Sequence, residues 1–300
     1  MSGISDQTGE GGTVEPAEAF AVIANETRLD ILEALWEFED RPVRFSELFE
    51  QIEMDDSAQF NYHLQQLTDQ FVVKTDDGYD LSHTGGQVIR ALRAGTYTRS
   101  PEIDPFRVDG ACTRCGGPLA AEYADEQLSI ACQDCGKAHG KYGFPPGGVE
   151  DRTEDEIAQA FDERVRHLYC LAVDGVCPEC SGRIHTEITQ EGECCLDVEV
   201  RAEHVCERCR HDLCSSVGLA LLDKAPVTAF YDDHGIDLTD RPYWTLPWCV
   251  DDQYVEVEST EPWRIQISIP LAEERLTVTL DGDLQIVDTH RIECTGPTGC

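Results

Sequence analysis

Residues 112–135 read Cys112-Thr-Arg-Cys115-Gly-Gly-Pro-Leu-Ala-Ala-Glu-Tyr-Ala-Asp-Glu-Gln-Leu-Ser-Ile-Ala-Cys132-Gln-Asp-Cys135. Two Cys-x-x-Cys pairs are separated here by 16 residues, which form two apolar stretches around Ala-Asp-Glu-Gln. Each pair supplies two thiolates from one tight turn, and two such turns complete a tetrahedron around zinc. The stretch therefore predicts a zinc ribbon with hairpin strands over 119–123 and 128–132. Gly116 and Gly136 follow the two pairs directly, where the backbone must turn.

The same arrangement occurs a second time along the chain. Two further pairs are separated by 25 residues, with strands expected near 183–189 and 196–205. With 15 cysteines in 300 residues, about one Cys-x-x-Cys pair would arise by chance, so four pairs in two sets are a specific signal. We therefore expect two structural zinc ions per chain, held by Cys112, Cys115, Cys132, Cys135, Cys177, Cys180, Cys206 and Cys209.

Alternatives for the cysteines remain open. Iron in a rubredoxin-like site has the same ligand spacing, whereas a redox-active thiol pair normally occurs alone at the start of a helix. Cys214 lies close enough to the second ribbon to replace one of the eight ligands. The default for the remaining seven is a small buried apolar side chain. They are Cys170, Cys194, Cys195, Cys214, Cys249, Cys294 and Cys300.

The charge balance is strongly acidic throughout. There are 59 acidic and 23 basic residues, a net charge of −36, and only four of the bases are lysine. Residues 1–100 hold 19 acids and 7 bases, so the excess is not confined to one tail. Such a uniform excess resembles the proteins of salt-in halophiles such as haloarchaea, because molar salt shortens the Debye length to ~3 Å and screens self-repulsion. A mesophilic acidic protein is the alternative, which the scarcity of lysine disfavours.

The N-terminal third has helical spacing followed by a hairpin signal. A first helix begins near Pro16 with Phe20, Ile23 and Ala24 at core positions, and Asn25 can cap a second. Shorter helices are expected from Ser46 and over 57–69. Asp76-Asp-Gly78 between apolar runs predicts a two-stranded hairpin, which a helix over 85–94 then follows. This order predicts a winged helix-turn-helix domain over residues 14–100.

Four stretches of this region resemble a known family. Asn25-Glu-Thr-Arg-Leu-Asp-Ile-Leu32 and Phe60-Asn-Tyr-His-Leu64 resemble the ArsR-type regulators. Asp77-Gly-Tyr-Asp-Leu-Ser-His-Thr-Gly-Gly86 and Ala94-Gly-Thr-Tyr97 resemble their haloarchaeal branch, and the rest of the chain resembles a Cys-rich C-terminal domain found attached to such winged helices. The resemblance implies a transcriptional regulator that binds double-stranded DNA as a homodimer through its first and fifth helices.

The family's metal-sensing sites have no counterpart here. Residues 45–54 lack the cysteine pair of the arsenic sensors, and His83 has no second ligand downstream in the fifth helix. That helix offers Val88, Ile89 and Leu92 as an apolar strip for the dimer. The signal is therefore left open, with an effector at the C-terminal domain as one possibility.

The helix over 57–69 is the candidate DNA reader. At 100° per residue, Phe60, Leu64 and Leu67 cluster on one side and are expected to face the core. Gln and Asn can pair with adenine in the major groove, and Tyr and Ser can reach bases or phosphates. Residues 57–68 contain no acid, and neither do 81–101. The predicted contacts are Ser57, Gln59, Asn61, Tyr62, Gln65 and Gln66, with Lys74 and Thr75 of the wing.

The domain boundaries follow from these signals. We expect a disordered tail over 1–13, the winged domain over 14–100, a first ribbon over 105–150 and an amphipathic helix over 151–173, with Ile157, Phe161, Val165, Leu168 and Leu171 inward. A second ribbon over 174–215 and an α+β domain over 216–300 follow. In the latter, an apolar helix is expected after Cys214 toward Leu222, with a second helical stretch to Tyr231, and alternating residues predict an antiparallel meander. The fold class is α+β.

An enzyme is not expected. The chain has no phosphate loop, serine nucleophile elbow or His-Glu-x-x-His helix, and His185, His204 and His211 beside the second ribbon are expected to be solvated. Residues 1–16 contain no Lys or Arg and no apolar stretch, which predicts a cytoplasmic protein without a secretory signal. The alternative function is a protein-interaction module of the basal transcription apparatus, which the acidic wing tip at Asp76 and Asp77 slightly favours.

Overall fold

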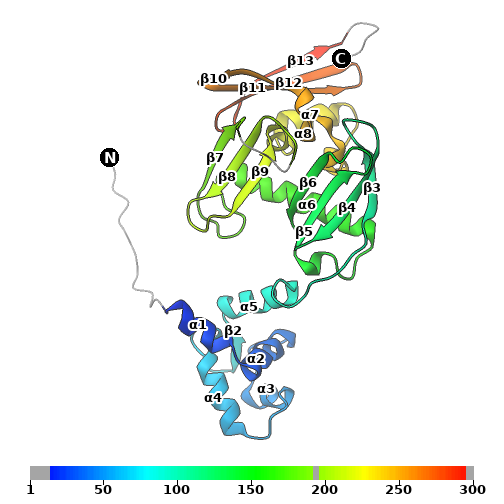
Figure 1. The fold of residues 1–300 in the computed structure, drawn as a ribbon. Coiled ribbons are helices and arrows are strands. Elements are labelled where there is room, and N and C mark those ends of the chain that lie inside the picture. The colour runs from blue at the N-terminus through cyan, green and yellow to red at the C-terminus, as the bar shows by residue number, and fades with distance from the viewer. Residues whose placement is uncertain (1–13, 192–195, 295–300) are drawn as a thin grey trace, which may run out of the picture. The chain divides into compact units, whose positions relative to one another are not determined.

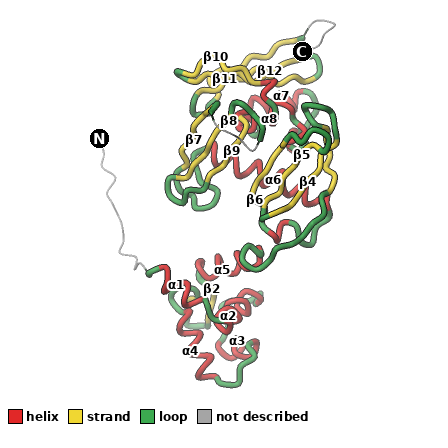
Figure 2. The backbone as a smooth tube through the Cα atoms, in the orientation of Figure 1, coloured by secondary structure: helices red, strands yellow, loops and turns green. Residues whose placement is uncertain are grey.

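The fold is that of a computed structural model, which describes residues 14–191 and 196–294. The tail predicted over 1–13 lies outside the described residues. The chain divides into two compact units, Met1–Thr98 and Arg99–Cys300. The first is mainly helical, whereas strands dominate the second (Figure 2). In the described part of the chain, no helix combines the length and apolarity needed to cross a membrane.

The N-terminal unit consists of short helices and one hairpin (Figure 1). Its described elements are α1 (Pro16–Ile23), α2 (Glu26–Glu37), α3 (Phe45–Gln51), α4 (Ser57–Leu67), β1 (Val72–Lys74), β2 (Tyr79–Leu81) and α5 (His83–Ala94). The strands pair antiparallel around the predicted Asp-Asp-Gly turn. This order of helices and hairpin is the one expected from the sequence.

Local capping decides where these helices begin and end. The Asn25 side chain accepts a hydrogen bond from the amide of Arg28, as predicted, at 3.2 Å. α3 begins before Ser46 rather than at it, because the Arg44 amide donates to the Glu47 carboxylate at 3.0 Å. α5 likewise begins two residues before the predicted start, because the Ser82 hydroxyl accepts from the amide of Gly85.

One apolar core holds the unit together. Phe60, Leu64 and Leu67 are at most 1% exposed, which confirms the predicted inward side of α4. The core position predicted for Phe20 is wrong, because its side chain is 69% exposed. Ile23 packs against the core as predicted, Ala24 is exposed, and Val22 contributes a core contact that was not expected.

The first sheet of the C-terminal unit carries four antiparallel strands. They are β3 (Phe106–Ala111), β4 (Pro118–Ala124), β5 (Gln127–Cys132) and β6 (Ala138–Gly143), paired in that order. β4 and β5 contain the two predicted hairpin strands, with Leu119 opposite Cys132. The two outer strands were not predicted. They widen the ribbon into a sheet with one face in the core.

The second sheet has three antiparallel strands. They are β7 (Ile184–Thr189), β8 (Arg201–Cys206) and β9 (Asp212–Ser216). β8 begins five residues later than the strand expected over 196–205. The helix expected after Cys214 is wrong at its start, because residues 212–216 form β9 and only Val217–Leu221 are helical, as the short 3₁₀ segment η2.

A long helix, α6 (Glu154–Val173), connects the two sheets in sequence and contacts β3, β7 and η2. It begins with a capping box, in which Thr153 and Glu156 each accept from the other's backbone amide. Ile157, Phe161 and Val165 are buried as predicted, but Leu168 is only half-buried and Leu171 is 42% exposed. Tyr169 continues the buried row instead, so the predicted inward phase is wrong over the last two turns.

The remainder forms the predicted antiparallel meander, preceded by short helices. The strands are β10 (Val255–Thr260), β11 (Trp263–Leu271), β12 (Glu274–Asp281) and β13 (Ile286–Glu293), paired in that order. Ile267 lies opposite Val278, and both are fully buried. The short helices of the unit are η1 (Pro146–Gly148), α7 (Ala225–Asp233), η3 (Leu238–Asp240), η4 (Tyr243–Thr245), α8 (Pro247–Val250) and η5 (Asp252–Tyr254).

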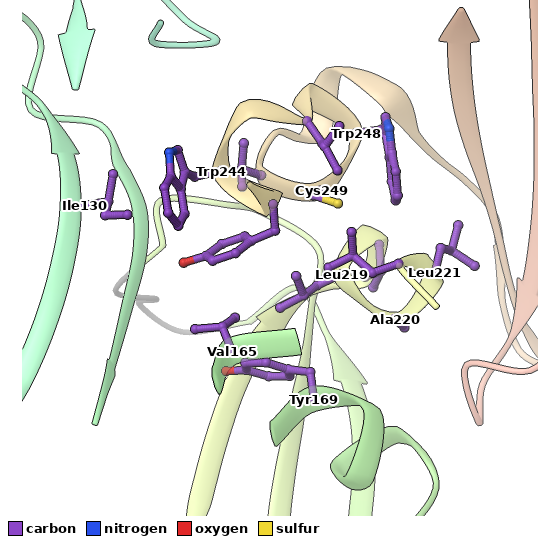
Figure 3. Close-up of a cluster of buried hydrophobic side chains, with 14 of the residues drawn as sticks. Ile130, Val165, Tyr169, Leu219, Ala220, Leu221, Trp244, Trp248 and Cys249 are labelled. Atoms are coloured by element: carbon purple, nitrogen blue, oxygen red, sulfur yellow. The ribbon is translucent and has the colours of Figure 1, made fainter. Parts of the chain in front are cut away.

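One large core joins the three sheets of this unit. Its buried side chains come from all of them and from α6, η2, η4 and α8. Figure 3 shows Ile130 of β5, Tyr169 of α6, Leu219 of η2 and Trp244 of η4 converging on one cluster. The parts expected at 105–150, 151–173, 174–215 and 216–300 therefore pack as one body.

Candidate metal centres and nucleic-acid interface

The first four-cysteine group combines the ends of two hairpins. The sulfur atoms of Cys112, Cys115, Cys132 and Cys135 all lie within 4.8 Å of one another. Cys112 Sγ is 3.6 Å from Cys135 Sγ, and Cys115 Sγ is 3.5 Å from Cys132 Sγ. A tetrahedron with Zn–S bonds of about 2.3 Å has S–S edges of about 3.8 Å, whereas a disulfide bond is about 2.05 Å long. The four free thiols are therefore spaced for a shared metal ion.

Two matching turns hold these sulfur atoms. The Cys112 amide donates to Gly117 O at 2.8 Å, and the Cys132 amide donates to Lys137 O at 2.9 Å. Gly116 and Gly136 both have a φ of +73°, as the predicted turns require. The amides of Cys135 and Asp134 face the Cys132 sulfur and lower the pKa of its thiol to about 7. Such amides favour the thiolate, which is the form that binds metal.

The second group repeats this construction in β7–β9. The sulfur atoms of Cys177, Cys180, Cys206 and Cys209 also lie within 4.8 Å of one another. Cys177 Sγ is 3.7 Å from Cys209 Sγ, and Cys180 Sγ is 3.5 Å from Cys206 Sγ. The amide of Cys209 donates to Cys206 and lowers the pKa of that thiol to about 6.

The turns of the second group use no glycine at the left-handed position. Ser181 has a φ of +57° and Arg210 a φ of +63°, where the first group has glycine. The Ser181 amide donates to Cys177 O at 2.9 Å, and the Arg210 amide donates to Cys206 O at 3.1 Å. The cysteine pairs are therefore a better sequence signal for this turn than the glycines after them.

Among the other described cysteines, only Cys249 follows the predicted default of a small buried side chain. Cys214 is in neither group of the described residues, so it does not replace a ligand. Cys249 is buried as expected, whereas Cys170 is exposed and Cys214 is half-buried. Cys294 is disulfide-bonded, which the sequence did not indicate. Cys194, Cys195 and Cys300 lie outside the described residues.

One histidine beside the second group contradicts its expected exposure. His204 is 0% exposed, whereas His185 is exposed and His211 is half-buried. The His204 ring lies 2.9 Å from the Thr186 hydroxyl and 3.1 Å from the Ser215 hydroxyl. Burial lowers the pKa of His204 to about 4, so the ring is neutral at pH 7.

The candidate DNA-reading residues lie on α4 and the hairpin. Asp56 caps α4 by accepting from the amides of Ala58 and Gln59, which places its negative charge at the positive end of the helix. Within α4, two polar side chains are half-buried, Asn61 and His63, and five are exposed. Those five are Ser57, Gln59, Tyr62, Gln65 and Gln66.

The hairpin presents both charge signs. Lys74 and Thr75 are exposed on one arm, and Asp76 and Asp77 are exposed at the tip. The Lys74 ammonium lies 5.8 Å from the centre of the Tyr79 ring, in cation–π range. The arm thus offers one cation for a phosphate, while the tip repels phosphates.

An acidic groove lies elsewhere on the N-terminal unit. Its volume is about 570 Å³, and Asp30, Glu33, Glu37 and Glu53 line it together with Arg93. Arg93 forms an ion pair with Glu37 in this groove. The acids of this unit are therefore gathered partly away from the outer side of α4, which carries none.

Comparison with known proteins gives two family matches. Residues 109–286 match a family model described as "Domain of unknown function (DUF7351)", which covers more than half of the chain. Residues 16–92 match a second model, described as "Domain of unknown function (DUF7347)". No curated protein and no solved structure matches the chain. Neither description states an activity, so a proposal about function has to be argued from the residues themselves.

Proposed function

The chain belongs to the family described as a domain of unknown function (DUF7351), and we propose that it is a sequence-specific DNA-binding transcriptional regulator of ArsR type. In this proposal the N-terminal unit is a winged helix-turn-helix. α3 and α4 form the helix pair, β1 and β2 form the wing, and α5 closes the domain. α4 enters the major groove, where its glutamines meet base edges.

The outer side of α4 is the observation that carries this proposal. Ser57, Gln59, Tyr62, Gln65 and Gln66 are exposed, and the helix has no acid in a chain with 59. An amphipathic helix needs polar residues on its solvent-exposed side, and in a chain this rich in acids most of these residues would ordinarily be Asp or Glu. Neutral hydrogen-bonding side chains at these positions are what base recognition in a polyanion requires.

We propose zinc for both four-cysteine groups, in a structural role. Four sulfur ligands in a tetrahedral arrangement suit zinc, and such a site leaves no open position for a substrate. The second group fixes hairpin ends that otherwise pack only in a small apolar cluster around Ala172, Ile184 and Cys206. The metal would therefore contribute directly to the folding of each ribbon.

We further propose a homodimer formed through α1 and α5. α1 buries no side chain, although it is apolar, and Phe20 remains 69% exposed. Tyr97, three residues after the end of α5, is 78% exposed. The strip expected from Val88, Ile89 and Leu92 has to be corrected, because Ile89 is fully buried in the core of its own unit. Phe20 and Tyr97 are the better candidates for the contact.

The test is selection of DNA by the full chain from a random-sequence duplex pool in molar potassium chloride. Enrichment of a two-fold symmetric site, followed by footprinting, supports the regulator. Gln59→Ala and Tyr62→Ala should weaken that binding. Gln51→Ala is the matched control, because Gln51 is an exposed glutamine on α3 that lines the acidic groove. Failure to enrich any sequence, with co-purification of polymerase or a general factor, would favour the alternative of a protein-interaction module.

A further inference from the structure

The two four-cysteine groups use their neighbouring cations differently. In the first group, the buried Lys137 ammonium lies 3.4 Å from Asp251 Oδ2, which also accepts from the Thr113 hydroxyl at 2.9 Å. Arg114 of the same group forms an ion pair with Asp197. Both cations of the first group are thus paired within the protein and tie its turns to residues 197 and 251.

The second group carries three arginines on its turns, and all three are exposed. Arg183 directly follows the first turn, and its carbonyl accepts from the Glu207 amide at 3.0 Å. Arg208 and Arg210 belong to the second turn, and a Cβ at Gly182 would lie 3.0 Å from the Cβ of Arg208. The backbone therefore brings the attachment points of three arginine side chains into one small region.

These arginines have no ion pair within the described part of the chain. Seven other arginines do form such pairs there, namely Arg41, Arg93, Arg99, Arg114, Arg166, Arg201 and Arg291. The two turns and the residues directly after them also carry three exposed acids, Glu179, Glu207 and Asp212, yet none of them forms a described ion pair with these arginines. An unpaired cationic cluster is the least expected feature on such a surface.

Neutralisation of the metal site does not account for the cluster. Four thiolates around Zn²⁺ sum to −2 in both groups, yet the first group has its two cations drawn away into pairs with Asp197 and Asp251. The guanidinium group is planar and donates in pairs to phosphate oxygens, which makes arginine the preferred side chain for a phosphate backbone.

We propose that the second four-cysteine group presents Arg183, Arg208 and Arg210 to the phosphate backbone of DNA, as a contact separate from α4. The inference takes its partner from the proposed function. It assigns to the C-terminal unit a direct part in binding, in addition to the folding role of its metal ions. Because phosphate contacts carry no sequence information, this surface would add affinity without specificity.

The test compares two triple variants of the full chain on the duplex enriched by the wild-type protein. R183Q/R208Q/R210Q removes the cluster. R107Q/R241Q/R264Q is the matched control, because it removes the same charge from exposed arginines outside the turns. Each phosphate contact contributes about −0.9 to the slope of log K against log salt, so the cluster variant should shift this slope by about +2.7, with the control near wild type.

Four outcomes would overturn the assignment. An unchanged slope in the cluster variant, or an equal shift in both variants, leaves the proposed regulator intact but removes this contact. Metal analysis is run on every variant, and loss of about one zinc equivalent from the cluster variant would assign the arginines to the metal site instead. If the wild-type chain enriches no duplex, the proposed function fails first and this inference fails with it.

Discussion

Replacing Phe60 by alanine should destabilise the N-terminal unit without removing any group that could touch DNA. Phe60 lies in α4 and is 0% exposed, and its ring centre lies 5.1 Å from those of both Phe45 and Phe49. Truncation leaves a cavity where the Phe60 ring was. The neighbouring rings of Phe45 and Phe49 are both fixed to the backbone of α3, so they do not move in to fill it. Buried Phe→Ala changes cost about 3–5 kcal/mol. A small domain has about 5–15 kcal/mol in total, so much of its stability is lost.

The neighbouring change Gln59→Ala should have the opposite profile. Gln59 is exposed on the outer side of α4, and only its backbone amide takes part in the cap with Asp56. Its stability effect should stay within about 0.5 kcal/mol, while specific DNA affinity falls by about 1–3 kcal/mol for a lost bidentate base contact.

Hydrogen exchange of α2 and α4 peptides in the full chain, over a urea titration in molar salt, separates these effects. It follows the N-terminal unit alone, although the C-terminal unit is present. Equal destabilisation by Phe60→Ala and Gln59→Ala would refute the assignment of inner and outer sides. Unchanged affinity of Gln59→Ala for the enriched duplex would instead remove Gln59 from base recognition.

Three further outcomes are expected. Protein purified without added zinc should carry about two equivalents of zinc. The variant Cys112→Ser should lose the zinc ion of the first ribbon and unfold that ribbon, and Cys206→Ser should do the same to the second. A single equivalent of zinc in the wild-type protein, or iron in place of zinc, contradicts this prediction. The pKa of His204 is about 4 in the folded chain, against 6.5 for an ordinary histidine, so unfolding takes up a proton below pH 6.5. The free energy of unfolding should therefore fall between pH 6.5 and 4, by up to roughly 3 kcal/mol. A H204Q variant should flatten this slope relative to H185Q, and identical slopes refute it. Specific binding should survive molar potassium chloride, with a shallow or positive salt dependence, because dilute salt unmasks repulsion by the acids; a steep negative slope from protein that circular dichroism shows to be folded contradicts it.

Local signals made the metal sites predictable. A Cys-x-x-Cys pair places two sulfur atoms through a single turn, so the ligands follow from spacing, and the structure brings together the same eight cysteines. The inner side of α4 was predictable for a similar reason, because Phe60, Leu64 and Leu67 repeat over almost the whole helix. In both cases the deciding contacts lie close together in sequence.

Predictions that depended on distant partners were less accurate. Leu171 is exposed because α6 turns a different side toward the core near its end, where Tyr169 packs with Tyr142 of β6 at 5.0 Å between ring centres. His204 is buried because β8 is the middle strand of its sheet, and the outer strand β9 had not been predicted. Spacing along one segment cannot show which other segment will cover it.

The shared core also bears on what each ribbon can do. A separate ribbon would be free to adjust to a partner, but the first is joined to the body of the unit by the Lys137–Asp251 pair, where the ammonium is 2% exposed. Breaking a buried pair leaves an uncompensated charge, so the first ribbon is held firmly in place. The turns of the second ribbon form no such pair among the described residues, and their arginines face solvent. In our proposal, two sites with the same ligands and similar sulfur spacing therefore have different tasks, one in holding the fold together and the other in contacting the phosphate backbone.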